Sequence, residues 1–242
     1  MIKISRSKLE RFLECPRCFW LETKKNISRP PTFPFTINSS IDALLKKEFD
    51  EHRAAGTPHP IITAAGIDAV PYAHPNIDTW RHNFTGIQFH HQPTDFLVFG
   101  AVDDVWVDKQ GNLIVVDYKS TGSNQHHIYD EYARQLSVYQ WLLRKNGFPV
   151  SSRGYFVFAR VDKSAHFSVM EDEPQNGSDK ERPAGKHAWL PFDIFVEGLE
   201  ADDSWVEGEL YNARRVYDLP TAPAANPKCP FCSYAFSNTS QI

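Results

Sequence analysis

The sequence predicts an α/β domain in which a mixed central β-sheet is flanked by helices. Two observations indicate this class. Apolar runs of strand length lie in the middle of the chain, and segments with apolar residues at helical spacing lie between and around them. Their order of strand, strand, helix and strand is typical of an α/β fold with a mixed sheet. The 242 residues, with 41% hydrophobic content, suffice for one sizeable core, so we expect a single domain over 1–242.

The first half of the chain gives two helical signals. Residues 5–22 have apolar side chains at helical spacing behind a serine that can cap them, which predicts an N-terminal helix. Residues 39–53 repeat that spacing and predict a second helix. Residues 54–95 are rich in proline and histidine without a clear period, so loops and short strands are expected there.

The centre of the chain gives the clearest signals. Long apolar strands are separated by a polar turn with Gly111 available for positive φ, and an amphipathic helix that stops before Gly147 follows. The elements predicted there are a strand at 96–108, a turn at 109–112, a strand at 113–120, a helix at 131–146 and a strand at 153–161.

The last third of the chain is predicted to hold one long helix. Residues 162–190 are polar and contain proline and glycine, which favours an exposed connection. Residues 202–217 have apolar side chains at helical spacing. The tail then carries two cysteines near its end.

Charged residues interrupt the two apolar strands of the predicted central hairpin. Asp103 lies in the first, and Asp117 and Lys119 lie in the second. Because side chains alternate along a strand, Asp117 and Lys119 share a face from which Tyr118 points away, and a hairpin can bring Asp103 beside them. Converging carboxylates are hard oxygen ligands that suit Mg²⁺ or Mn²⁺. The alternative is a buried ion pair of Asp117 with Lys119 or with an arginine.

A third motif follows on the next helix, where Gln135 and Tyr139 lie four residues apart on one face. Gly100-x-x-Asp103, Asp117-x-Lys119 and Gln135-x-x-x-Tyr139 together resemble the ordered motifs of the RecB/Cas4-like branch of the PD-(D/E)XK nuclease superfamily. The resemblance implies a restriction-endonuclease-like core at about 37–161. An N-terminal helix at 1–25 and a C-terminal segment at 195–242 would pack beside this core.

The resemblance also implies a role for each motif residue. Asp103 and Asp117 would bind the metal, joined by the backbone carbonyl of Tyr118. Lys119 would orient the attacking water and stabilise charge on the phosphate. Gln135 and Tyr139 would steady the site or contact the nucleic-acid backbone. The implied reaction is metal-assisted hydrolysis of DNA phosphodiester bonds, at single-stranded ends.

One departure from the family pattern concerns the helix before the first strand. RecB-like nucleases usually carry a metal-binding histidine there, whereas residues 37–50 contain none and Asp42 stands at the corresponding position. An aspartate can bind the same hard cation, so Asp42 is a candidate ligand. The alternatives are a degenerated site, or a helix charge in the first turn.

All four cysteines fall in two Cys-x-x-Cys pairs, Cys15 with Cys18 and Cys229 with Cys232. Two such pairs are a strong metal signature, so we expect a four-cysteine metal staple that joins the two ends of the chain. The spacing alone favours Zn²⁺. The resemblance favours a [4Fe–4S] cluster, although the related proteins draw one ligand from the N-terminal side and three from the C-terminal side, and Asn238 stands where the last would be.

Charge and composition restrict the kinds of partner that the protein can bind. The net charge of −4 and pI of about 6.2 mean that nucleic acid must be contacted by a local patch. No P-loop motif is present, so unwinding would need a helicase or a CRISPR or repair complex as partner. No apolar run reaches the ~20 residues of a membrane span and no secretion signal is evident, which predicts a cytoplasmic protein without membrane contact.

Two alternatives to a nuclease remain: a catalytically weak or inactive nucleic-acid-binding subunit of a DNA-processing complex, and a structural or redox cysteine-cluster protein.

Overall fold

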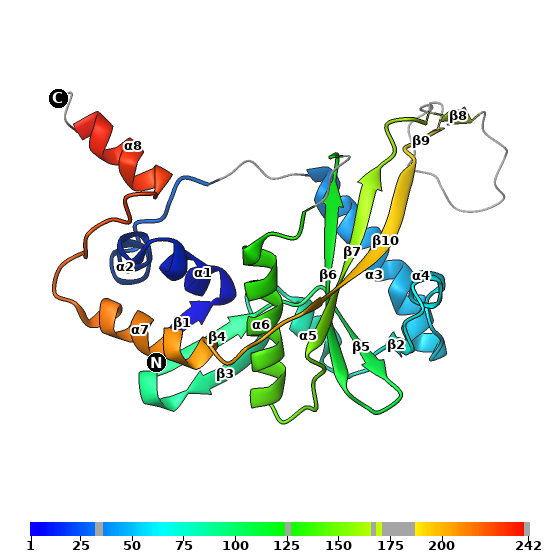
Figure 1. The fold of residues 1–242 in the computed structure, drawn as a ribbon, viewed down its shortest axis with the longest axis horizontal. Coiled ribbons are helices and arrows are strands. Elements are labelled where there is room, and N and C mark those ends of the chain that lie inside the picture. Colours follow the sequence, from blue (N-terminus) through cyan, green and yellow to red (C-terminus); the bar gives the residue numbers. More distant parts are fainter. Residues whose placement is uncertain (32–35, 124–126, 166–167, 171–186, 240–242) are drawn as a thin grey trace, which may run out of the picture.

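A five-stranded mixed sheet forms the centre of the computed structural model, which describes residues 1–31, 36–123, 127–165, 168–170 and 187–239 (Figure 1). Its strand order is β10-β7-β6-β5-β2. In this sheet β6 and β7 are parallel and the other described pairs are antiparallel, and α6 (Asp130–Lys145) connects β6 to β7. The strands are β2 (Ala69–Pro71), β5 (Asp104–Asp108), β6 (Leu113–Thr121), β7 (Arg153–Val161) and β10 (Phe192–Glu200).

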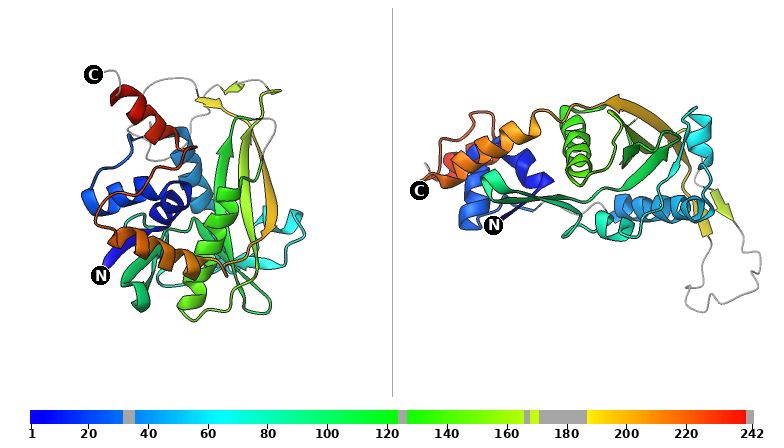
Figure 2. Two further views of the ribbon diagram at one scale, coloured as in Figure 1. Left: turned by 60° about the vertical axis from the view of Figure 1, so that its left-hand side comes forward. Right: turned by 90° about the horizontal axis from the view of Figure 1, so that it is seen from below.

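Helices cover both faces of this sheet, as the view from below in Figure 2 shows. Helix α6 packs on one face, where Leu136 meets Val115 and Phe156 in the larger core. Helices α3 (Thr36–Ala55) and α4 (Pro60–Ala64) pack on the other, where Phe49 lies against Trp106. Both sheet faces are therefore buried, which explains the long apolar runs of the central strands.

A second layer of structure brings the two chain ends together (Figure 1). A small sheet with the order β1-β4-β3 lies beside α6, and helices from both ends of the chain lie on the same side of the molecule. Its strands are β1 (Ile2–Ser5), β3 (Ile87–His91) and β4 (Phe96–Gly100). The helices are α1 (Arg6–Glu14), α2 (Pro16–Lys25), α7 (Val206–Asp218) and α8 (Pro230–Thr239).

The remaining elements are short: α5 (Ile77–Arg81), the 3₁₀ turn η1 (Gln92–Thr94), and the hairpin strands β8 (Ser168–Met170) and β9 (His187–Trp189). Much of the 162–190 connection predicted to be exposed lies outside the described residues. No helix of the described part of the chain is long and apolar enough to cross a bilayer.

Several predicted elements are confirmed at close to their expected bounds. Strand β7 covers 153–161, and α6 differs from 131–146 by one residue at each end. Gly111 closes the β5–β6 turn with φ of 85°, and Gly147 follows α6 with φ of 86°. Only glycine adopts such angles without steric cost.

Two predictions of a single continuous element are wrong, because the structure has two elements in each place. The N-terminal helix is broken at Cys15, which is extended (φ −159°, ψ 106°) because Pro16 disfavours a helical residue before it. The expected strand at 96–108 is two strands in different sheets, β4 and β5, separated at 101–103. Asp103 therefore precedes a strand instead of lying within one.

Candidate active site and metal centre

The break before β5 places Asp103 beside Asp117. Strands β5 and β6 are antiparallel with Asp104 opposite Val116, so the preceding residue, Asp103, faces the following residue, Asp117. The backbone N–H of Tyr118 donates to Asp103 Oδ2 at 2.9 Å, which fixes the carboxylate against the end of β6. The antiparallel pairing thus brings together two carboxylates that are far apart along the chain.

Asp117 anchors a chain of polar contacts between β6 and α6. It is 2% exposed, and Gln135 Nε2 donates to its Oδ1 at 2.6 Å. The same Nε2 lies 3.2 Å from Tyr139 Oη, while Lys119 Nζ donates to Gln135 Oε1 at 3.3 Å. The Lys119 ammonium also forms an ion pair with Asp117 Oδ2. The structure therefore brings together the residues of the second and third sequence motifs.

Gly100, in the first motif, leaves space for the ring of Tyr139, in the third motif. A Cβ atom at this position would lie 2.5 Å from Cε1 of Tyr139, far inside van der Waals contact. The absence of a side chain at Gly100 lets the Tyr139 ring pack against the β4 backbone, and Tyr139 as a whole is 4% exposed. Burial raises the pKa of Tyr139 to about 12, so it stays a neutral hydrogen-bonding group.

Asp42 lies near the carboxylate pair but is separated from it by Lys46. Lys46 Nζ donates to Asp42 Oδ2 at 2.8 Å and lies 3.6 Å from Asp103 Oδ1. Burial, followed by the charge of Asp103, raises the pKa of Asp42 despite this lysine. Within the described ranges, the only set of three or more His, Cys, Asp or Glu ligand atoms lying within 4.8 Å of one another is the cysteine cluster, so the three aspartates do not form a closed ligand set.

Sequence reasoning missed Asp104, which has the opposite environment to its neighbour. It is fully buried, and its Oδ1 accepts hydrogen bonds from Arg53 and, at 3.0 Å, from Arg81 Nη2. Its Oδ2 accepts from the Tyr118 hydroxyl at 2.8 Å. Arg81 Nε also donates to the carbonyl of Asp103 at 3.0 Å. Alternation in β5 could have indicated a core-facing aspartate, but nothing local identifies arginines from α3 and α5 as its partners.

The groups around Asp104 and around Asp103 differ in their balance of positive and negative charge. Two carboxylates, Asp50 and Asp104, meet two guanidinium groups in the Arg53–Arg81 cluster. Among the residues that the structure describes, the three carboxylates of Asp42, Asp103 and Asp117 form ion pairs with two ammonium groups, those of Lys46 and Lys119.

The shortage of positive charge appears at Asp103, and Asp117 beside it has an incompletely satisfied oxygen. Burial and the charge of Asp117 raise the pKa of Asp103 to about 7. Asp117 Oδ2 is buried and accepts no well-aligned hydrogen bond, although the Lys119 ammonium contacts it. A divalent cation with oxygen ligands would supply the missing charge, so the donor set fits one.

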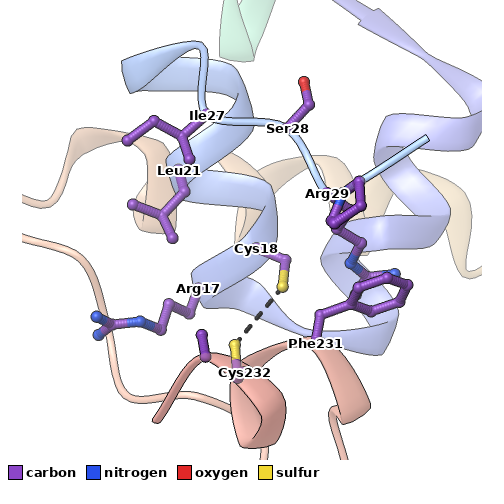
Figure 3. Close-up of a pocket in the computed structure, with 10 residues that line it drawn as sticks. Arg17, Cys18, Leu21, Ile27, Ser28, Arg29, Phe231 and Cys232 are labelled. Atoms are coloured by element: carbon purple, nitrogen blue, oxygen red, sulfur yellow. Dashed lines mark hydrogen bonds between the residues drawn. The ribbon is translucent and has the colours of Figure 1, made fainter. Parts of the chain in front are cut away.

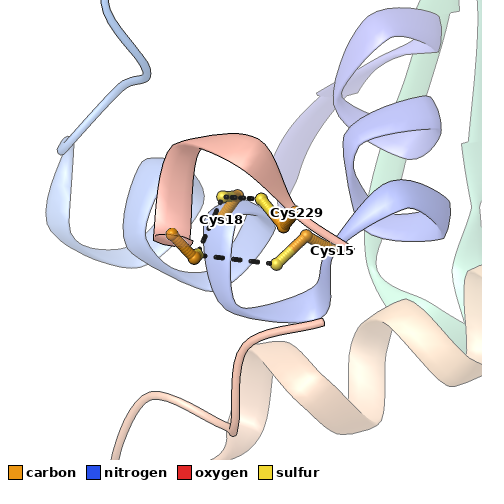
Figure 4. Close-up of side chains that lie close together, drawn as sticks. Cys15, Cys18 and Cys229 are labelled. Atoms are coloured by element: carbon orange, nitrogen blue, oxygen red, sulfur yellow. Dashed lines mark hydrogen bonds between the residues drawn. The ribbon is translucent and has the colours of Figure 1, made fainter. Parts of the chain in front are cut away.

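The four cysteines meet at a second site (Figure 4). Cys15 joins α1 to α2 and Cys18 lies in α2, whereas Cys229 precedes α8 and Cys232 lies in it. The sulfur separations are 3.9 Å for Cys15–Cys232 and 3.6 Å for both Cys18–Cys229 and Cys18–Cys232. All four residues are buried and no disulfide forms between them. The expected staple of the two chain ends is present as a cluster of free thiols.

The thiols of this cluster have divergent acidities. Burial raises the pKa of Cys15, but hydrogen bonds from the backbone of Asn226 and Cys18 outweigh it and lower the value to about 7. Burial and the neighbouring cysteines raise the pKa of Cys232. The Cys15 thiol therefore ionises readily, whereas the neighbouring cysteines oppose ionisation of Cys232. A bound cation would favour the thiolate form of both.

A largely apolar cavity of about 320 Å³ adjoins the cysteines (Figure 3). Arg29 borders it, with its guanidinium carbon 4.4 Å from the centroid of the Phe231 ring and its Nη2 3.8 Å from Cys229 Sγ. The same arginine forms an ion pair with Glu14. Arg29 therefore brings positive charge to the sulfur cluster and links it to α1.

Comparison with known proteins identifies the superfamily of the chain. The family model described as the PD-(D/E)XK nuclease superfamily matches residues 3–237. No curated protein matches the chain. A solved structure titled "Crystal structure of SSO0001" is similar at 13% identity, with a TM-score of 0.44 over 98% of this chain and 85% of that chain. Because the family model spans nearly the whole sequence, the chain belongs to the PD-(D/E)XK nuclease superfamily.

Proposed function

We propose that this protein is a RecB/Cas4-like nuclease that hydrolyses DNA phosphodiester bonds with Mg²⁺ or Mn²⁺, acting at single-stranded ends. The observation that carries the proposal is the contrast between neighbours. Asp104 is neutralised by two arginines, whereas Asp103 and Asp117 face each other with an incomplete set of positive charges. Such a pair is costly in a folded protein unless it binds a cation.

The roles of the residues follow from their contacts. Asp103 and Asp117 would hold the ion together with the backbone carbonyl of Tyr118, the residue after Asp117, and the ion would supply Lewis-acid chemistry and a more acidic water. The ammonium of Lys119, positioned by Asp117 and Gln135, would stabilise negative charge that develops on the phosphate. Gln135 and Tyr139 would keep Asp117 oriented, because Gln135 is hydrogen-bonded to both.

At the cysteine site we propose a single Zn²⁺ ion, the alternative to the [4Fe–4S] cluster that the resemblance favours. A tetrahedral zinc with Zn–S bonds of about 2.3 Å holds its sulfurs about 3.8 Å apart. The three sulfur separations of 3.6 to 3.9 Å match this value. The thiolates of a four-iron cluster bind different irons on its outside, so their sulfurs must lie farther apart. The role of the zinc would be structural, because the cysteines tie α2 to α8.

One observation favours the second candidate function, an inactive nucleic-acid-binding subunit. Lys46 lies between Asp42 and Asp103, where a third metal ligand would complete the site. If that ammonium permanently replaces a cation, the fold would bind DNA as part of a helicase-containing, CRISPR or repair complex without cleaving it.

The decisive experiment is a degradation assay on four DNA forms: single- and double-stranded, each open-ended and circular. The proposal predicts Mg²⁺- or Mn²⁺-dependent loss of open single strands, with circular and duplex forms spared. DNA binding without cleavage of any form would support the inactive subunit. Neither binding nor cleavage would contradict both functions.

A further inference from the structure

A ladder of aromatic rings leads from the candidate active site to the surface. Lys119 Nζ lies 4.7 Å from the centroid of the Tyr132 ring. Tyr132 packs on Phe156 inside the core and meets Tyr129 edge-to-face, with centroids 5.4 Å apart. Tyr129 is 53% exposed and meets the exposed ring of His127 at 4.9 Å. A continuous aromatic surface therefore begins beside the lysine that would contact the phosphate.

The sheet register places this ladder on the reactive face. Asp117 pairs with Phe156, and Lys119 pairs with Phe158, across the parallel β6–β7 ladder. Paired residues of adjacent strands project from the same face, so Phe156 lies on the side of the sheet that carries Asp117. Tyr132 covers that face from the first turn of α6, one turn before Gln135.

The charges around the exposed Tyr129 ring determine which part of a nucleic acid can bind there. Asp130 and Glu131 occupy the first turn of α6, directly after Tyr129. These carboxylates repel phosphate, so a nucleic-acid backbone would not lie along this turn. An uncharged, flat base avoids this repulsion and can stack on an exposed tyrosine ring.

We propose that Tyr129 and Tyr132 form a stacking platform for unpaired DNA bases next to the phosphate held at Asp103, Asp117 and Lys119. The proposal rests on the proposed nuclease function and deepens it, because a base inside a duplex is stacked on both faces and cannot meet these rings. The platform would select single strands by base stacking instead of by sequence, since every base has a π-face.

The test measures DNA binding in an Asp117→Ala background, so that it does not require cleavage. The probe is a fluorescein-labelled oligothymidylate in Mg²⁺, followed by anisotropy. Because it removes one stacked base at a half-exposed ring, Tyr129→Ala should weaken binding by about 5- to 20-fold. Tyr129→Trp should retain it. Tyr211→Ala is the matched control, because Tyr211 is 47% exposed on the distant α7 and should have no effect.

An abasic strand of the same length separates stacking from other causes. The platform predicts that Tyr129→Ala has no effect on the abasic strand, which offers no base to stack. Equal losses on the abasic and thymine strands, or no loss on either, would overturn the proposal. A wild-type protein that binds as described but never cleaves DNA would contradict the proposed nuclease function while leaving the platform supported.

Discussion

Replacing Asp103 by asparagine should stabilise the metal-free protein, whereas the same replacement at the adjacent Asp104 should destabilise it. Asp103 lacks sufficient positive charge around it, and its pKa rises from 3.8 to about 7. The folded state therefore disfavours the ionised carboxylate. The stability that protonated Asp103 contributes is present below about pH 4 and is lost as the pH rises to about 7.

The size of the effect follows from this difference in pKa. A tenfold change in proton affinity corresponds to about 1.4 kcal/mol. Above pH 7, ionised Asp103 therefore destabilises the folded state by at most about 4 kcal/mol. The Asp103 side chain is 27% exposed and Lys46 is close, so solvent and that ammonium reduce the penalty. We expect Asp103→Asn to raise the free energy of unfolding by about 1–3 kcal/mol at pH 8. The asparagine can still accept the hydrogen bond from the Tyr118 N–H.

The opposite result is expected at Asp104. Its replacement leaves the guanidinium groups of Arg53 and Arg81, whose side chains are 8% and 7% exposed, short of a countercharge. Loss of one partner from a buried ion pair costs about 3–5 kcal/mol.

Urea unfolding in EDTA at pH 5 and pH 8 measures both effects. Asp103→Asn should remove most of the stability difference between the two pH values. If it instead destabilises the protein at pH 8, or leaves the pH dependence unchanged, the inference that Asp103 lacks a countercharge is wrong.

Three further predictions follow from the same structure. Cys229→Ser should abolish binding of the metal that we propose at the cysteines and expose both 1–25 and 225–239 to protease; exposure of one end alone would contradict a shared site. Asp42→Ala should weaken Mn²⁺ binding about tenfold and Lys46→Met should strengthen it, as read by calorimetry; unchanged affinity in both would place Asp42 outside the metal site. Gly100→Ala should cost about 1–3 kcal/mol in urea unfolding, because the new methyl group meets the Tyr139 ring, and wild-type stability would show that the ring can move freely.

Local sequence patterns sufficed for much of the candidate site. Strand alternation placed Asp117 and Lys119 on one face, and helical spacing placed Gln135 and Tyr139 on another, and the structure shows these side chains in contact. These are short-range periodicities that the backbone imposes directly. The paired Cys-x-x-Cys spacing likewise indicated the cysteine cluster, because no other cysteine competes for it.

The features that were missed depend on contacts between distant segments. Nothing near Asp104 in sequence identifies Arg53 and Arg81 as its partners, and nothing near Asp42 shows that Lys46 reaches Asp103. The apolar run at 96–108 reads as one strand, but its two halves pair in different sheets. Strand β10 was not foreseen because its residues are only partly buried at the sheet edge and alternate weakly.

The most direct test of the central claim compares DNA cleavage by the wild-type protein with that of the Asp117→Ala variant. An end-labelled single strand is incubated with each protein in Mg²⁺ or Mn²⁺ and in EDTA, after circular dichroism has shown that both are folded. The account predicts metal-dependent degradation by the wild-type protein and none above background by the variant. Undiminished, metal-dependent degradation by Asp117→Ala would contradict the assignment of Asp103, Asp117 and Lys119 as the active site.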